Sequence, residues 1–247
     1  LVAQKRVSLL SAACQNTTFG NLTHVPISKF VLDRIFVCDK HKILFWPDSE
    51  SGQHAVEEGP DRAQRLNTYF KFLIVRDPFE RLISAFKDKF VKNPRFEPWY
   101  KHDIAPAIIR KYRKSHRSSD AAASGLHFED FVRYLGDVEG RRRVERQFGE
   151  HIIHWVTYAE LCAPCQIHYS VVGHHETLEQ DAPYILKAAG IQQVVSYPAI
   201  PPGITRYNRT KVESYFSGVS KRDIRRLYAR YQGDFYLFGY PSPDFLM

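Results

Sequence analysis

The stretch FKFLIVRDPFERLIS, residues 70–84, decides the fold of this chain, because it joins a β-strand to a helix through a short turn. Residues 70–75 are rich in β-branched and aromatic side chains, which favours a buried strand. Asp77 is a good N-cap, Pro78 suits the first helical position, and Glu80 completes a capping box. The apolar side chains that follow share one helical face: Phe79, Leu82, Ile83, Phe86 and Phe90.

The turn between this strand and helix has the residues of an anion site. Arg76 places a cation at the end of the strand, and Ser84 lies off the apolar stripe, on the polar side of the helix. The N-terminus of a helix attracts anions through its free N–H groups and its dipole. The sequence therefore predicts an anion pocket formed by the Arg76 guanidinium and the Ser84 hydroxyl.

Strands alternate with helices along the rest of the chain, which predicts an α/β fold with a mainly parallel sheet flanked by helices on both faces. The size of 247 residues suits one domain over residues 1–247. Besides 70–75, strands are predicted at 37–45, with His41–Phe45 as its core, around 151–158, and at 169–173. Helices are predicted at 78–90, 105–114, 128–136, 181–190 and 220–233, and loops at 46–65, 115–124 and 198–203.

The strand, the RDPFERLIS turn and the helix resemble the 3′-phosphate-binding segment of the Golgi carbohydrate sulfotransferases. The similarity covers roughly residues 7–45 and 66–246, including HIIHWVTYAELCAPCQIHYSVVGHHETLEQDAPYIL and KRDIRRLYARYQGDFYLFGY. Within that family it is greatest to enzymes that sulfate terminal glucuronic acid. The resemblance therefore implies a P-loop-like sulfotransferase fold and sulfuryl transfer to a glycan hydroxyl.

The resemblance also implies the partners and the setting. The donor is 3′-phosphoadenosine 5′-phosphosulfate (PAPS), and the acceptor is an acidic glycan on a glycoprotein or glycolipid, with no metal and no nucleic acid. The chain begins with Leu1, and the family implies an upstream signal anchor, hence a single-pass type II Golgi membrane protein with a lumenal catalytic domain. The resemblance implies that Arg76 and Ser84 bind the 3′-phosphate of the nucleotide. The implied nucleotide-binding segment consists of Arg76, Asp77, Pro78, Phe79, Glu80, Arg81, Leu82, Ile83 and Ser84.

A second anion-binding element of the family is missing from this sequence. Members carry a Pro-Lys-x-Gly-x-Thr-x-Trp-Lys loop for the 5′-phosphosulfate directly after the strand equivalent to 41–45. Here residues 46–52 read WPDSESG, with no Lys or Arg before Arg62, and the acids Asp48 and Glu50 repel a phosphosulfate. A weak anion nest at Ser49, Ser51 and Gly52 is the alternative.

The family's next crossover helix also looks absent, because 46–65 has no apolar helical stripe. We therefore expect that 46–65 replaces the phosphosulfate loop and helix, and that this chain has lost most sulfotransferase activity. The alternative in the same family is a non-catalytic relative that binds only nucleotide or glycan.

Transfer to a hydroxyl calls for a general base, and the sequence offers several candidates. His102 and His154 both lie among aromatic residues, and an Asp or Glu base is equally open. Two basic clusters, 110–114 and 141–143, could attract an acidic sugar, although a solvated helix face is the more usual role of such runs.

The net charge of +8 and the pI near 9.3 favour anionic partners, which leaves a basic nucleic-acid-binding protein as the out-of-class alternative. Against it, the chain has no helix-turn-helix, zinc-finger or RNP signature. The absence of a GxxxxGK[ST] motif also argues against an NTPase.

Cysteines and sequons fit a lumenal protein. Four cysteines allow three full pairings. The Cys162-x-x-Cys165 pair is compatible with three roles: a structural disulfide or inert thiols, a zinc site, or a redox motif. The four cysteines are Cys14, Cys38, Cys162 and Cys165, and the predicted N-glycosylation sites are Asn16, Asn21 and Asn208.

Overall fold

The computed structural model describes residues 2–16, 26–46, 60–92, 97–113, 125–199, 201 and 204–246. The chain divides into two compact units. The first consists of residues 1–77, 156–207 and 233–241, and the second of residues 78–155, 208–232 and 242–247.

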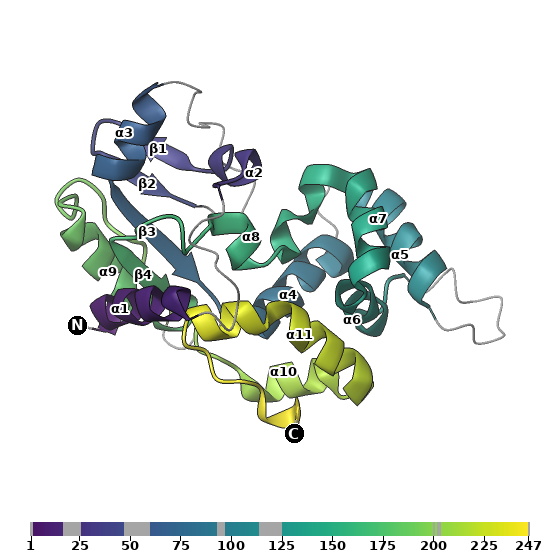
Figure 1. The fold of residues 1–247 in the computed structure, drawn as a ribbon. Helices are drawn as coiled ribbons and strands as arrows, with labels where there is room; N and C mark the ends of the chain where they lie inside the picture. The colour runs from purple at the N-terminus through teal and green to yellow at the C-terminus, as the bar shows by residue number, and fades with distance from the viewer. Residues whose placement is uncertain are drawn as a thin grey trace. The chain divides into compact units, whose positions relative to one another are not determined.

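The first unit is built on a four-stranded sheet in the order β1-β2-β3-β4 (Figure 1). The strands are β1 (Phe36–Cys38), β2 (Ile43–Phe45), β3 (Phe70–Val75) and β4 (Val171–His174). β1 runs antiparallel to β2, whereas β2, β3 and β4 are parallel to one another. The predicted α/β fold with a mainly parallel sheet is therefore confirmed.

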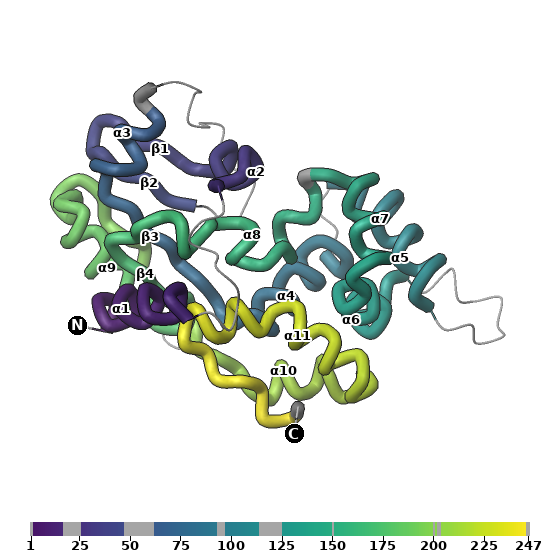
Figure 2. Tube along the Cα trace, in the orientation of Figure 1, coloured from purple at the N-terminus to yellow at the C-terminus, as the bar shows by residue number. Residues whose placement is uncertain are grey.

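Helices cover both faces of this sheet because the side chains of β3 alternate between two apolar clusters. Leu73 and Val75 join the larger cluster, and Phe72 and Ile74 join a smaller one with Ile185 of α9. α1 and α9 both lie against β4, although they are far apart in the sequence (Figures 1 and 2). The helices of this unit are α1 (Val2–Gln15), α2 (Lys29–Leu32), α3 (Pro60–Thr68), α8 (Tyr158–Cys162), the 3₁₀-helix η6 (His175–Thr177) and α9 (Leu178–Ala188).

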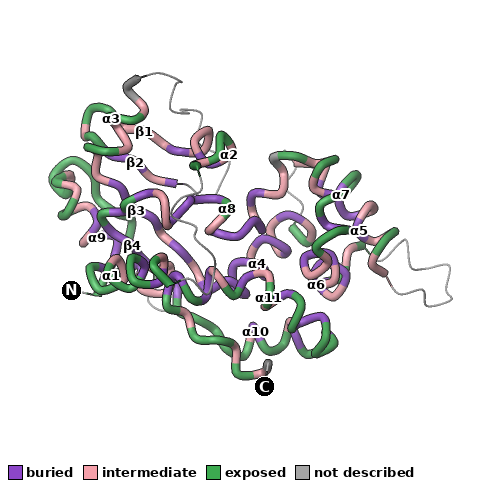
Figure 3. Tube along the Cα trace, in the orientation of Figure 1, coloured by how far each residue is buried: buried purple, intermediate pink, exposed green. Residues whose placement is uncertain are grey.

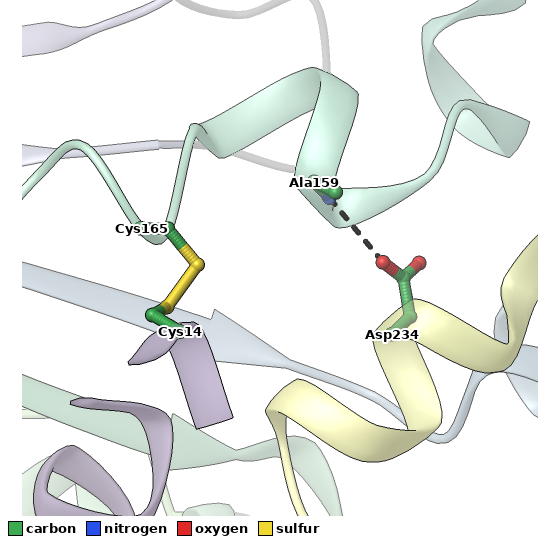
Figure 4. Close-up of a disulfide and its surroundings, with 4 residues drawn as sticks. All are labelled: Cys14, Ala159, Cys165 and Asp234. Atoms are coloured by element: carbon green, nitrogen blue, oxygen red, sulfur yellow. Dashed lines mark hydrogen bonds between the residues drawn. A yellow bond between two sulfur atoms is a disulfide. The ribbon is translucent and has the colours of Figure 1, made fainter. Parts of the chain in front are cut away.

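A disulfide between Cys14 and Cys165 ties the end of α1 to the segment after α8 (Figure 4). Cys38 is half-buried and Cys162 is buried, both as free thiols. Because the Cys165 sulfur is bonded to Cys14, the CxxC pair supplies neither an internal redox disulfide nor two thiolates for zinc. The structural-disulfide interpretation of this motif is confirmed.

The second unit is helical and has an aromatic core. Phe131 and Trp155 lie at its centre with their ring centroids 5.4 Å apart, and Phe90 packs on Trp155 at 5.7 Å. Its elements are α4 (Pro78–Phe86), the π-helices η3 (Lys87–Lys92) and η4 (Tyr100–Ile104), α5 (Ala105–Tyr112), α6 (Phe128–Gly136), α7 (Val138–Phe148), the 3₁₀-helix η5 (Gly149–Trp155), α10 (Arg209–Phe216), α11 (Lys221–Leu237, whose last turn belongs to the first unit) and the 3₁₀-helix η7 (Asp244–Leu246).

The strand predicted around 151–158 is wrong, since this stretch forms η5 and then α8. Ile153 and Trp155 are buried inside the helical unit rather than in the sheet. Thr157 then caps α8, accepting the Glu160 N–H at 3.2 Å.

Several predicted boundaries were also wrong. His41 and Lys42 form a turn before β2, in which Lys42 has a φ of 53°. α9 begins at Leu178, so Pro183 lies inside it, and α11 continues through Gly233 to Leu237. No helix was predicted where α1, α7 and α10 form.

The β2–β3 connection contains a helix that the sequence did not predict. α3 has nine residues, so the loop predicted over 46–65 is wrong for residues 60–65. The absence of the family's crossover helix stays a prediction. The helix is mostly polar, with Leu66 packed against the core and Arg65 paired with Asp39 at 2.9 Å. Residues 47–59 and the predicted linker 115–124 lie outside the described residues. In the part of the chain that is described, no helix has the length and apolar character needed to cross a bilayer.

Candidate functional site

The turn after β3 is held by two side chains from other parts of the first unit. The N–H of Arg76 donates to the Tyr158 hydroxyl oxygen at 3.0 Å, and the N–H of Asp77 donates to Glu176 Oε1 at 2.7 Å. Arg76 is half-buried and Asp77 is buried. Both peptide N–H groups of the turn are therefore already used within the protein.

Glu176 reaches the turn because β3 and β4 are parallel neighbours. Val75 pairs with His174 at the carboxyl end of the two strands, so Asp77 and Glu176 each lie two residues beyond this pair. The other carboxylate oxygen, Oε2, accepts the Tyr240 hydroxyl at 2.8 Å. Burial, together with the Glu176 charge, raises the pKa of Tyr240, which keeps this hydroxyl a donor.

Tyr158 is itself fixed by α11. The Tyr158 N–H donates to one carboxylate oxygen of Asp234 at 2.9 Å. The Ala159 N–H donates to the other at 3.3 Å (Figure 4). Asp234 is only 1% exposed, so it provides a buried cap for the start of α8.

His174, an uncharged histidine, packs beside Tyr240, the residue that holds Glu176. The His174 ring stacks on Tyr240 with centroids 4.6 Å apart. Burial, with a smaller effect of the Arg6 charge, lowers the pKa of His174 to about 4. The neighbouring carboxylate, Asp181, accepts the His174 N–H at 2.8 Å and pairs with Arg6 at 2.5 Å.

The nine predicted nucleotide-binding residues divide between the units, with Arg76 and Asp77 in the first and Pro78–Ser84 in the second. The predicted apolar stripe is confirmed in α4, where Phe79, Leu82 and Ile83 are buried and Ser84 is half-buried.

Two charged residues of α4 have contacts inside the second unit. Glu80 is buried and accepts the Asn208 N–H at 3.2 Å. Arg81 donates to the Ile153 carbonyl at 3.1 Å. These contacts hold the helix that carries Ser84.

The candidate bases both lie in the second unit. His102 is exposed on η4, and His154 is half-buried on η5, with its ring centroid 6.1 Å from that of Tyr100. Their catalytic role stays a prediction, as does that of an Asp or Glu base.

A basic hollow lies along α7 in the second unit. Of the predicted cluster 141–143, Arg141 is buried and pairs with Glu145 at 2.6 Å, and Arg230 lies 3.8 Å from the same carboxylate. The hollow has a volume of about 540 Å³ and is lined by Glu139, Arg142, Arg143, Glu145 and Arg146. Figure 3 shows α7 with much of its surface exposed. Because Glu145 already faces Arg141 and Arg230, the three exposed arginines of the lining outnumber its remaining carboxylate, Glu139.

The second basic cluster, 110–114, carries less free charge. Arg110 and Lys111 are exposed, but Arg113 pairs with the buried Asp130 at 2.7 Å. Lys114 lies outside the described residues.

Two of the three sequons can be placed. Asn16 is exposed and its amide donates to the Tyr236 hydroxyl at 2.7 Å, and Asn208 is exposed and caps α10 by accepting the Lys211 N–H at 2.9 Å. Asn21 lies outside the described residues. Glycosylation of all three stays a prediction.

A model of the sulfotransferase family matches residues 47–241. Over the whole chain, the sequence is 64% identical to carbohydrate sulfotransferase 10 of Danio rerio and 59% identical to that of Homo sapiens, covering 77% and 78% of those proteins. It is 38% identical to carbohydrate sulfotransferase 11 of Rattus norvegicus over 76% of this chain and 51% of that protein. No solved structure shows significant similarity.

The alignments also reveal a deletion. The Danio rerio and Homo sapiens alignments each span 282 positions against a chain of 247 residues, so at least 35 positions of these relatives have no counterpart here.

Proposed function

The chain belongs to the sulfotransferase family, and from this premise we propose that it transfers the sulfuryl group of PAPS to a glycan hydroxyl, on an acceptor that ends in glucuronic acid. The observation that carries the proposal is the identity of 59–64% over the whole chain to carbohydrate sulfotransferases. The family match runs through both units, which supports one sulfotransferase domain over residues 1–247. It also favours this function over nucleic-acid binding.

We propose that the nucleotide's 3′-phosphate is held at the turn after β3. The N–H groups of Arg76 and Asp77 already donate to Tyr158 and Glu176, and the Asp77 carboxylate has no donor, so the Arg76 guanidinium must supply the binding hydrogen bonds at this turn. An arginine guanidinium suits this task because its planar fork can donate two parallel hydrogen bonds to a phosphate. The role of Ser84 as a second donor, and that of the other residues of Arg76–Ser84 in shaping the segment, stay predictions.

The proposed site lacks cationic residues for the 5′-phosphosulfate end of the donor. We assign the missing positions to the connection after β2, where residues 46–52 lack the cations that a leaving phosphate needs. Asp48 and Glu50 add repulsion. Transfer by this chain should therefore be much slower than by its relatives. A protein that only binds nucleotide or glycan is the second candidate, and turnover separates the two.

The α7 hollow supports an acidic acceptor. Arg142, Arg143 and Arg146 are exposed around it, and the negative charge of Glu145 is offset by Arg141 and Arg230. A carboxylate on the glycan would gain charge-assisted hydrogen bonds from these guanidinium groups.

A transfer assay with labelled PAPS tests the proposed function and the acceptor together. We expect sulfate on an oligosaccharide that ends in glucuronic acid, and none on the same oligosaccharide ending in galactose. Replacing Arg142→Glu and Arg143→Glu together should lower the rate at limiting acceptor about threefold to tenfold, since two attractive charges become repulsive. The rate at saturating acceptor should change little.

The matched control is Arg222→Glu with Arg225→Glu, which reverses two exposed charges of α11 that do not line the hollow. Equal loss in both double variants would mean that only net charge matters. Equal transfer to the two acceptors would refute the glucuronic acid assignment.

We propose the Golgi lumen as the setting. The Cys14–Cys165 disulfide supports an oxidising compartment, as do the two sequons whose Asn16 and Asn208 are exposed. The type II signal anchor that the family implies stays a prediction.

A further inference from the structure

We propose that Glu176 is a positioning residue for nucleotide binding: it holds the peptide of Asp77, and thereby directs the Arg76 side chain toward the 3′-phosphate. This inference rests on the proposed function. It assigns no contact with the nucleotide to Glu176 itself.

The two carboxylate oxygens of Glu176 have different partners. Oε1 accepts the Asp77 N–H at 2.7 Å, and Oε2 accepts the Tyr240 hydroxyl at 2.8 Å. Hydrogen bonds to a carboxylate are stronger than those between neutral groups. Tyr240 therefore fixes the orientation of the carboxylate, and the carboxylate fixes the peptide at Asp77.

A second hydrogen bond holds the preceding peptide. The Arg76 N–H donates to the hydroxyl of Tyr158, which is 1% exposed, and Asp234 holds Tyr158 by its own N–H. Two successive peptide groups are thus fixed from α8 and from η6. Rotation of the backbone at Arg76 would break at least one of these bonds, so the direction of its Cα–Cβ bond is set by the pair.

The other carboxylate beside β4 has a different role. Asp181 accepts the His174 N–H and the Thr177 hydroxyl and pairs with Arg6, so its contacts tie α1 and α9 to the strand. Glu176 is the carboxylate that links β4 to the phosphate-binding turn.

A double-mutant cycle tests the proposal, with 3′-phosphoadenosine 5′-phosphate as the probe and isothermal titration as the measurement. Glu176→Ala should weaken binding about tenfold, because the Asp77 N–H loses its charged acceptor. Arg76→Ala should weaken it by at least as much. The double variant should bind no more weakly than Arg76→Ala alone, because Glu176 acts only through Arg76.

Two conservative variants test the positioning role with less risk that a loss of binding reflects unfolding. Glu176→Gln should bind within about threefold of the unmodified chain, because its carbonyl oxygen can still accept the Asp77 N–H. Tyr240→Phe removes one hydroxyl and should weaken binding about threefold. The controls are Glu179→Ala, which removes an exposed charge on α9, and Tyr197→Phe, at an exposed position, and both should bind normally.

The outcomes separate this inference from the function on which it rests. Additive losses in the double variant, or normal binding by Glu176→Ala, would overturn the positioning role. Tighter binding by Glu176→Gln would also overturn it, since the carboxylate would then act by repelling the nucleotide. Normal binding by Arg76→Ala would instead overturn the assigned phosphate site.

Discussion

Restoring the missing positions, which we assign to the connection after β2, is expected to raise the rate of sulfuryl transfer by about 10²–10³-fold. The change replaces residues 46–65 with the Danio rerio segment that aligns between Phe45 and Leu66. Charge develops on the bridging oxygen as the sulfuryl group leaves, and the loss of a donor aimed at such a charge typically costs this much. The measurement is the turnover rate with labelled PAPS at saturating acceptor.

Two controls separate the chemistry of the segment from its length. A Gly/Ser insert of equal length should leave the rate unchanged, because it brings no cation. Replacing the lysines of the grafted segment by alanine should remove most of the gain. An unmodified chain that already turns over as fast as the restored one would contradict the assignment of the missing positions.

Loss of the Cys14–Cys165 disulfide should lower the free energy of unfolding by about 2–5 kcal/mol. The bridge joins residues 151 apart in sequence, so in the chain-entropy account it removes a large loop-closure entropy from the unfolded chain. Denaturant unfolding of Cys14→Ser with Cys165→Ser measures the loss. The matched control is Cys38→Ser, which changes a half-buried free thiol and should cost much less.

A loss no greater than that of the control would mean that packing alone holds α1 against the sheet. In that event the oxidising setting would lose its main support. Reduction of the unmodified chain with dithiothreitol should reproduce the effect of the double variant.

The sequence predicted the elements with strong local signals. β3 and α4 were evident because an apolar run, Asp77, Pro78 and a five-residue apolar stripe all indicate the same boundary. The elements that were missed depend on tertiary contacts. α3 is polar except for Leu66, and η5 has buried residues whose alternation imitates a strand.

The support of the site was not predictable from local pattern. Arg76 was predicted from its place after a strand, but Tyr158, Glu176 and Tyr240 are distant in the sequence and meet the turn only in the folded chain. One signal was available: the carboxyl ends of parallel strands meet at one edge, so polar residues just past β3 and β4 could have been paired.

The central claim is that Arg76 binds the 3′-phosphate, and a comparison of two nucleotides tests it most directly. Titration of the unmodified chain should show 3′-phosphoadenosine 5′-phosphate binding at least about tenfold more tightly than adenosine 5′-phosphate, which lacks the 3′-phosphate. Arg76→Ala should remove most of this preference and leave the affinity for adenosine 5′-phosphate nearly unchanged. Equal affinity for the two nucleotides, or a preference that survives in Arg76→Ala, would contradict the claim.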